Sequence, residues 1–289
     1  MTDYTSMLKE PPYRPPLVHP TRGGGCIPSA PLRFDAPVPT CRAPVPRFDV
    51  ADAMIDLSPY CNPAQLQTGG SCGANGFANA VEVMLRRGCP SWRVQEIVEK
   101  KLPKREDGCV PPWQIDGDAI YAAACMAFHG NLADNGLEMS EIAQLGELTR
   151  IFAGESVVRI EVNTEALADA LAHGPFLMGR ALCAGDNEPD PTNGYVAVSM
   201  PNPVAGHCQC VVEYRFQAQE LYWLVQQTWG RKFGWNGYVR YGDGFLQYCQ
   251  FPGVNDRPMQ WRPVGDWWER NLDALVKWIG TDVDPGGMQ

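Results

Sequence analysis

The sequence predicts an α+β protein built from two lobes, and three features of the chain lead to this fold class. Between about residues 51 and 150, apolar residues recur at the three- and four-residue spacing of helices. Between about residues 151 and 252, runs rich in β-branched and aromatic residues are typical of strands. Residues 1–50 resemble neither half, since they hold 11 of the 26 prolines. Helices and strands gathered in separate halves favour a helical lobe followed by a β lobe.

Three helices are predicted in the helical lobe, each from a stripe of apolar side chains. The stripes run through residues 77–85, 94–102 and 120–128. Gly130 follows the third stripe directly, and a glycine in that place commonly ends a helix. The helical lobe should therefore be a small group of packed helices.

The β lobe is predicted to hold several strands around one short helix. The strands are expected at residues 157–162, 176–182, 208–216, 222–228 and 237–241, and the helix at residues 165–173. Residues 253–289 are set apart as a tryptophan-rich C-terminal tail. The apolar spacing from Leu272 to Ile279 predicts one amphipathic helix in that tail.

Length and charge exclude several classes of protein. The chain has 289 residues, enough for a buried core, and no stretch comes near the roughly 18 apolar residues that a membrane-spanning helix needs. The first residues lack a basic start followed by an apolar core, so we expect a protein that is cytoplasmic at synthesis. The net charge of −9, with no dense basic block, argues against nucleic acid as a partner.

The chain has 11 cysteines, an odd number, and no readable secretory signal. This combination predicts reduced thiols rather than a disulfide framework. No spacing of cysteines and histidines suits a metal site, and we expect neither a metal nor an organic cofactor. Cys208 and Cys210 fall at alternating positions of a predicted strand, where burial in the core is the expected outcome.

One cysteine, Cys72, follows a glycine-rich turn and stands at the start of the first predicted helix. Residues 65–72 read Gln-Leu-Gln-Thr-Gly-Gly-Ser-Cys. A thiol at a helix N-terminus meets the positive end of the helix dipole, which lowers its pKa toward the thiolate form. The glycines let backbone N–H groups approach a reacting carbonyl, and Gln67, or else Gln65, is placed to add a side-chain donor. The ordinary alternative for this turn is a buried structural cysteine.

A histidine and a glutamine complete the candidate chemistry. His207 stands at the start of a predicted strand, and Gln227 stands at the end of the next strand along the chain. Antiparallel pairing of these strands would bring the two side chains together. The amide would then orient the imidazole ring, while the other ring nitrogen faces a thiolate. Taken alone, a histidine in such a strand is more often structural.

Together these segments resemble the papain-like cysteine peptidases, family C1. That family carries a Gln- and Gly-rich stretch before Ser-Cys, a Gly-His at a strand start, and Asn-Ser-Trp-Gly followed by Trp-Gly-x-x-Gly-Tyr. The matching stretches here are Gly70–Cys72, Gly206–His207 and residues 227–238. The resemblance covers roughly residues 52–250 and implies a papain-like two-lobe fold with an antiparallel, barrel-like β lobe. It also implies that Gly117 and Trp229 line the substrate cleft.

The activity implied by the resemblance is a thiol hydrolase that cleaves peptide bonds through an acyl-enzyme thioester. Cys72 would be the nucleophile and His207 the group that holds and delivers the proton. Gln227, in place of the family's Asn, would fix the ring, and Gln67 would stabilise the oxyanion.

Two registers of the family motif compete at the nucleophile. The form Ser-Cys-Gly-Ser-Cys-Trp, common in lysosomal and plant members, would place Asn75 at the nucleophile and make the chain inactive. The bacterial form Gly-Ser-Cys-x-Ala-Asn matches residues 70–75 position by position. We therefore predict Cys72 as the nucleophile of a bacterial or phage-type member.

Two other functions stay open at this point. A glutamine deamidase or transglutaminase-like effector would use the same thioester, and papain-like deamidases of the cycle-inhibiting-factor type use a Cys-His-Gln set. A catalytically weak, papain-fold component of a phage or secretion assembly would account for the extensions at residues 1–50 and 253–289, through which an assembly partner would bind. These alternatives imply an exported effector or a virion-associated protein.

The boundaries that we predict are a Pro-rich extension at residues 1–50 and a catalytic domain at residues 51–252. The extension carries six Lys or Arg and four Asp or Glu, a charge of +2, which leaves −11 for the remainder. A stiff polyproline-like chain loses little entropy on docking. We expect this segment to lie along the cleft as an inhibitor, or else to be a strap over the surface.

Overall fold

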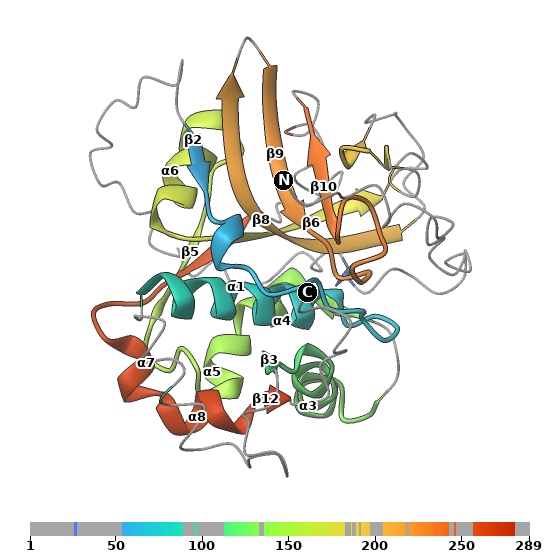
Figure 1. Ribbon diagram of the computed structural model, residues 1–289. Helices are drawn as coiled ribbons and strands as arrows, with labels where there is room; N and C mark the ends of the chain where they lie inside the picture. Colours follow the sequence, from blue (N-terminus) through green and yellow to red (C-terminus); the bar gives the residue numbers. More distant parts are fainter. Residues whose placement is uncertain are drawn as a thin grey trace, which may run out of the picture.

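The computed structural model of the chain shows a sheet packed above a group of helices, with α1 (Cys72–Gly88) between them (Figure 1). It describes residues 54–88, 96, 113–132, 136–182, 186, 189–190, 192–196, 205–217, 220–242, 246 and 257–280, and the backbone of residues 26–27. Apart from residues 26–27, the Pro-rich extension lies outside the described residues. The helix expected at residues 94–102 does too, except for Glu96.

The described helices belong mostly to the lower group. They are α1, α3 (Gly117–His129), α4 (Met139–Ala143), α5 (Leu145–Thr149), α6 (Thr164–His173), α7 (Trp267–Arg270) and α8 (Leu272–Lys277), with the 3-10 turn η3 (Ser58–Tyr60). Gly130 follows α3 with a φ of 70°, the left-handed conformation expected of a glycine at a helix end. The helix α6 lies apart from the lower group, beside the sheet and behind its strands in Figure 1.

Eight strands form the main sheet. They are β2 (Met54–Asp56), β5 (Ser156–Arg159), β6 (Phe176–Leu182), β7 (Tyr195–Val196), β8 (Ala205–Gln217), β9 (Glu220–Gln226), β10 (Tyr238–Tyr241) and β11 (Met259–Arg262). Their order is β5-β11-β6-β8-β9-β10-β7, and β2 also pairs with β8. Two small pairs join β1 (Cys26–Ile27) to β4 (Leu137–Glu138) and β3 (Gln114–Ile115) to β12 (Ile279–Gly280). This two-lobe α+β architecture confirms the predicted fold class.

The first helix, α1, is buried along most of its length rather than on one stripe. All of its residues from Cys72 to Leu85 are buried, because the sheet covers one side and α3 and α4 cover another. Small residues make this close packing possible. A Cβ added at Gly73 would lie 2.5 Å from the side chain of Ile142. The helical lobe and the sheet therefore meet across α1.

The C-terminal residues differ from the separate tail that the sequence predicts. The strand β11 lies inside the main sheet, between β5 and β6, and β12 pairs with β3 of the helical lobe. Trp261, Trp267 and Trp268 are core residues, and Trp278 is partly buried against the core. Trp261 packs edge-on against Phe77 of α1 and stacks on Phe152. The helix expected from Leu272 to Ile279 is present as α8, and the short helix α7 before it was not predicted. The burial of these large aromatic side chains stabilises the packing of this segment against the rest of the protein.

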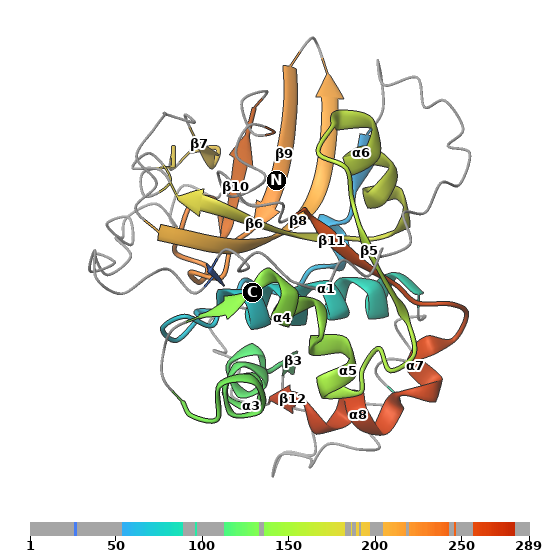
Figure 2. The same ribbon diagram turned by 180° about the vertical axis from the view of Figure 1, so that it is seen from behind.

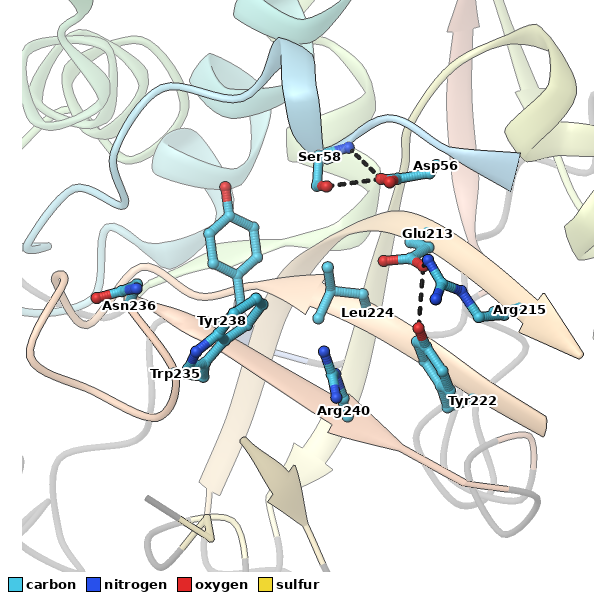
Figure 3. Close-up of a pocket in the computed structure, with 10 residues that line it drawn as sticks. All are labelled: Asp56, Ser58, Glu213, Arg215, Tyr222, Leu224, Trp235, Asn236, Tyr238 and Arg240. Carbon is cyan, nitrogen blue, oxygen red and sulfur yellow. Dashed lines mark hydrogen bonds and ion pairs between the residues drawn. The ribbon is translucent and has the colours of Figure 1, made fainter. Parts of the chain in front are cut away.

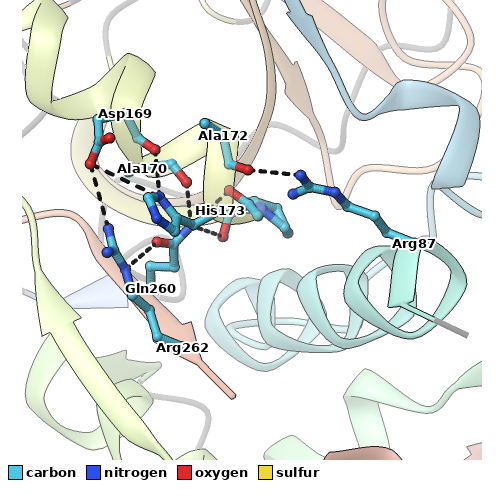
Figure 4. A network of polar contacts seen from close by, with 9 residues as sticks. Arg87, Asp169, Ala170, Ala172, His173, Gln260 and Arg262 are labelled. Carbon is cyan, nitrogen blue, oxygen red and sulfur yellow. Dashed lines mark hydrogen bonds and ion pairs between the residues drawn. The ribbon is translucent and has the colours of Figure 1, made fainter. Parts of the chain in front are cut away.

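A cluster of polar contacts joins α6 to β11 and to α1 (Figure 4). The amide nitrogen of Gln260 donates to the carbonyl oxygens of Ala170 and Gly174, both at 2.7 Å. Arg87 of α1 donates to the carbonyl of Ala172 at 2.7 Å. These carbonyls stand at the end of α6, where a helix lacks backbone partners of its own. The contacts therefore cap α6 and fix the turn that leads into β6.

A buried carboxylate lies within α1. Glu82 is fully buried, and its Oε1 accepts a 2.6 Å hydrogen bond from the backbone N–H of Ile115, while Oε2 has no partner among the described residues. Burial raises the pKa of Glu82 to about 7, against the opposing effect of the Ile115 bond. Near neutral pH, the carboxyl group is therefore close to half protonated.

We expect Glu82→Gln to raise the free energy of unfolding at pH 8.5 by about 1–3 kcal/mol and to change it little at pH 5. The raised pKa means that native Glu82 is protonated at pH 5, whereas at pH 8.5 folding must bury a charge. Urea unfolding at both pH values measures the difference. Glu165→Gln, an exposed change on α6, serves as the control. An equal gain at both pH values would contradict the burial of a charge.

Candidate functional site

The candidate nucleophile occupies the first residue of α1, where a carboxylate of α3 fixes the preceding turn. Asp118 accepts hydrogen bonds through Oδ1 from the Ser71 hydroxyl at 2.5 Å and from the Asn75 side-chain amide at 2.8 Å. The backbone N–H of Thr68 also donates to it, at 3.3 Å. One oxygen atom thus joins the turn before Cys72, the first turn of α1 and the start of α3.

The close approach of α3 to this turn explains one predicted glycine. A Cβ added at Gly117 would lie 2.6–2.7 Å from atoms of Asn75, so only glycine fits there. The structure thus gives Gly117 a packing role at the edge of α3. Its contact with substrate stays a prediction.

The side chain of Cys72 contacts the β lobe. Its Sγ accepts a 3.3 Å hydrogen bond from the backbone N–H of Cys208, the residue directly after His207 in β8. Asn75, the nucleophile position in the competing register, instead bonds Ser71 and Asp118 within the helical lobe. The geometry therefore puts Cys72, and not Asn75, beside the strand that carries the histidine.

His207 is held by the two residues that the sequence singles out at the end of β9. Its Nε2 lies 3.0 Å from Oε1 of Gln227, and its ring stacks on Trp229 with centroids 4.4 Å apart. Since Oε1 is an acceptor, Nε2 carries the proton, which leaves Nδ1 with a lone pair. Trp229 is held in turn by Phe233, edge-on at 4.7 Å. The stacked ring keeps water from the bond between His207 and Gln227.

A short strand-like pairing brings the glutamine-rich segment beside this tryptophan. The backbone N–H of Gln67 donates to the Thr228 carbonyl at 2.7 Å, and that of Gly230 donates to the Gln65 carbonyl at 2.9 Å. This pairing explains how two segments more than 150 residues apart come to flank Cys72 and His207.

The side chains of the two candidate oxyanion glutamines point to different places. The Gln67 amide nitrogen donates to the Gly69 carbonyl at 2.7 Å, and its Oε1 accepts from the Thr228 hydroxyl. The Gln65 amide nitrogen donates to the Ile115 carbonyl at 2.8 Å. Gln67 therefore stays within the turn that leads to Cys72, while Gln65 binds β3. For Gln67 to bind the oxyanion, its side-chain amide would have to break the hydrogen bond to the Gly69 carbonyl and donate to the oxyanion instead.

The protonation states differ from the thiolate that the sequence predicts. Cys72 is 0% and His207 1% exposed. Burial raises the pKa of the Cys72 thiol, even though the N–H groups of Gly73 and Cys208 act to lower it. Burial also lowers the pKa of His207 to about 3. The helix-terminus effect is thus present but outweighed, and both groups are neutral while they are shielded from water.

Arg180 is a neighbour of His207 that the sequence analysis missed. The two residues pair across β6 and β8, and Arg180 is fully buried with an ion pair to Asp186 at 2.5 Å. Its charge also lowers the pKa of His207. The available signal was an arginine within the apolar run of residues 176–182. A charge there is compatible with a buried strand only when a partner such as Asp186 neutralises it.

Within the described part of the chain, no group of three or more His, Cys, Asp or Glu side chains could hold a metal ion. Cys208 and Cys210 are both fully buried, as expected for core positions of β8. None of the helices in the described ranges is long and apolar enough to cross a membrane.

Part of the chain is similar to one family of known proteins. Residues 148–255, which include His207, Gln227 and Trp229 but not Cys72, match the model of the papain family cysteine proteases. The chain has a papain-like fold. Its match to the family supports a cysteine peptidase, a thiol protease among the hydrolases. No curated protein matches the chain.

Similar solved structures include xylellain, a cysteine protease from Xylella fastidiosa, with 16% identity and a TM-score of 0.58 over 84% of this chain and 97% of that one. Digestive procathepsin L 3 from Tenebrio molitor larval midgut has 15% identity and a TM-score of 0.53, over 85% of this chain and 77% of that one. At these identities the likeness concerns the fold.

We expect Asp118→Ala to lower kcat on a peptide substrate by about 10- to 100-fold with little change in KM, because the turn carrying Cys72 loses its anchor. Asp118→Asn, which keeps an acceptor oxygen, should restore most of kcat. Steady-state kinetics with circular dichroism as a folding check measures the effect, and Asp266→Ala serves as a surface control. If Asp118→Ala instead raised KM by a similar factor and left kcat unchanged, the result would contradict a positioning role for Asp118.

Proposed function

We propose that the protein is a bacterial or phage-type papain-like thiol hydrolase that cleaves peptide bonds with a Cys72-His207-Gln227 triad. The observation that carries the proposal is the meeting of α1 and β8. Cys72 lies 3.3 Å from the N–H of Cys208, and the neighbouring His207 is bonded to Gln227 at 3.0 Å. A thiol, an imidazole and an amide that fixes the ring are the parts that such chemistry needs.

In the proposed reaction, the proton of the Cys72 thiol moves to Nδ1 of His207, and the sulfur attacks the carbonyl carbon of the scissile bond. The negative oxygen that forms is bound by the Cys72 N–H and, after release from Gly69, by Gln67. His207 then gives its proton to the leaving amine as the carbon–nitrogen bond breaks. Water, deprotonated by His207, cleaves the thioester and regenerates the thiol.

We expect Cys72→Ala to abolish peptide hydrolysis and covalent labelling by a thiol-directed epoxide, because the sulfur is the atom that both reactions consume. Labelling is read by intact-protein mass spectrometry, and hydrolysis by new chain ends in a digested protein library. Cys125→Ala, at a buried cysteine of α3, is the matched control and should still label. Labelling that persists in Cys72→Ala would rule out this nucleophile.

The same library separates peptidase from deamidase activity. The Cys-His-Gln set suits both, since each forms a thioester with an acyl group. Mass gains of about one dalton at glutamine side chains, without new chain ends, would favour the deamidase. The match of residues 148–255 to a family of proteases favours the peptidase.

We further propose that the N-terminal extension lies along the catalytic cleft. The short strand β1 pairs in parallel with β4 and also contacts β8. In Figure 2 this dark-blue strand lies between α1 and the sheet. Leu137, the partner of Cys26 in this pairing, is near Gly73, the residue after Cys72. A strand in that place supports an inhibitory role for the segment over a surface strap.

A chain that begins at Ala51 should therefore hydrolyse peptides faster than the full-length protein, and its Cys72 should be labelled faster, because the cleft is uncovered. Progress curves with a fluorogenic peptide compare the two chains at equal active-site concentration. An unchanged rate together with a lower thermal midpoint would show that residues 1–50 are a strap.

A further inference from the structure

A pocket lies on the β lobe, where residues of β2, β8, β9 and β10 line it (Figure 3). Its volume is about 290 Å³. The lining residues are Asp56, Ser58, Glu213, Arg215, Tyr222, Leu224, Trp235, Asn236, Tyr238 and Arg240. None of them belongs to the proposed triad, so the pocket is distinct from the catalytic centre.

One end of the pocket carries excess negative charge. Asp56 and Glu213 face each other at paired positions of β2 and β8. Arg215 forms a 2.9 Å ion pair with Glu213, which leaves one net negative charge for the three residues. Oδ1 of Asp56 accepts hydrogen bonds from the backbone N–H and the hydroxyl of Ser58, and Oδ2 has no partner among the described residues. Like charges placed opposite each other in a sheet destabilise it, so this end favours a cation.

The opposite end carries an arginine without an acceptor. The guanidinium of Arg240 lies over the ring of Tyr222 at 5.2 Å and over that of Trp235 at 5.0 Å. Its side chain makes no hydrogen bond or ion pair with any described residue, and its Nε is buried without a partner. Two aromatic rings thus hold a planar donor group in a fixed position, which suits a carboxylate.

Between the two ends, Leu224 and Trp235 contribute apolar side chains to the lining. Leu224 of β9 pairs with Glu213 on one side and with Arg240 on the other, and Figure 3 shows it between the acidic residues and the arginine. Trp235, which is 43% exposed, forms one wall. Because neighbouring strands are about 4.8 Å apart, the backbones of β8 and β10 are about 10 Å apart. A peptide of two or three residues spans at most about 7–10 Å.

We propose that this pocket binds a short zwitterionic peptide with an apolar side chain. The ammonium group lies at Asp56 and Glu213, the carboxylate binds Arg240, and the side chain lies on Leu224 against Trp235. Such peptides are products of the proposed reaction, but the binding does not depend on it.

The test uses full-length protein carrying Cys72→Ala and the probe glycyl-leucine, measured by isothermal titration calorimetry. Saturable binding at one site is expected. N-acetyl-glycyl-leucine and glycyl-leucinamide, which each lack one charge, should bind at least 10-fold more weakly. Equal binding of the capped peptides, or no saturable binding of glycyl-leucine, would overturn the proposal. Because the nucleophile is absent, the outcome is independent of whether the protein is a peptidase.

Variants assign the binding to this pocket rather than to the catalytic cleft. Arg240→Leu should abolish binding, and Asp56→Asn, a change that preserves size, should weaken it at least 10-fold. Arg257→Leu, which removes a charge near β5 and β11 at the far edge of the sheet, should bind as the parent does. Unchanged binding by folded Arg240→Leu or by Asp56→Asn would overturn the proposal.

Discussion

The burial of α1 between the two lobes is the constraint on which the rest of the structure depends. A helix covered on several sides must present small or apolar residues all round, and residues 72–85 do so with few exceptions. The exceptions are Asn75, Asn79 and Glu82. Asn75 donates to Asp118 and Glu82 accepts from Ile115, both in the helical lobe, whereas the buried side-chain amide of Asn79 has no hydrogen-bond partner among the described residues. The position of α1 thereby sets where Cys72 lies, at the start of the helix and beside β8.

The strands β2 and β12, from the early and the late part of the described chain, pair with different lobes and hold them around α1. The strand β2, which precedes α1, pairs with β8 in the sheet, while β12, near the end of the described chain, pairs with β3 of the helical lobe. Trp278 supports the second pairing with a hydrogen bond from its indole N–H to the Thr149 carbonyl at 3.0 Å. Neither lobe is therefore made of one continuous segment, and separation of the lobes would break both pairings.

The sequence allowed the main elements and the pairing of His207 with Gln227 to be predicted, because both depend on local patterns: strand alternation and a short connection between β8 and β9. What escaped prediction depends on contacts distant in sequence. Asp118 lies 47 residues from Ser71, and no periodicity marks a carboxylate that accepts from a distant turn. Likewise, the direction in which the pKa of Cys72 shifts depends on the burial of the thiol, and only the packing of the two lobes determines that burial. The strand β11 is too short to show alternation of its own.

One segment, from Gln227 to Arg240, contributes both to the proposed catalytic centre and to the pocket of the β lobe. Its shape requires glycines. At Gly234 and Gly237 the φ angles are 56° and 85°, and an added Cβ would lie 2.3 Å from the Tyr238 carbonyl oxygen and from Ala64, respectively. These two glycines let the chain turn tightly after Trp229, which stacks on His207, and return in β10 with Arg240 in the pocket. The backbone bond from Gln227 N–H to the Gly237 carbonyl, at 2.8 Å, closes that turn. The glycines of Phe233-Gly234 and Gly237-Tyr238 are therefore a backbone requirement, and Gln227, which bonds His207, is fixed by the same turn that forms the pocket wall.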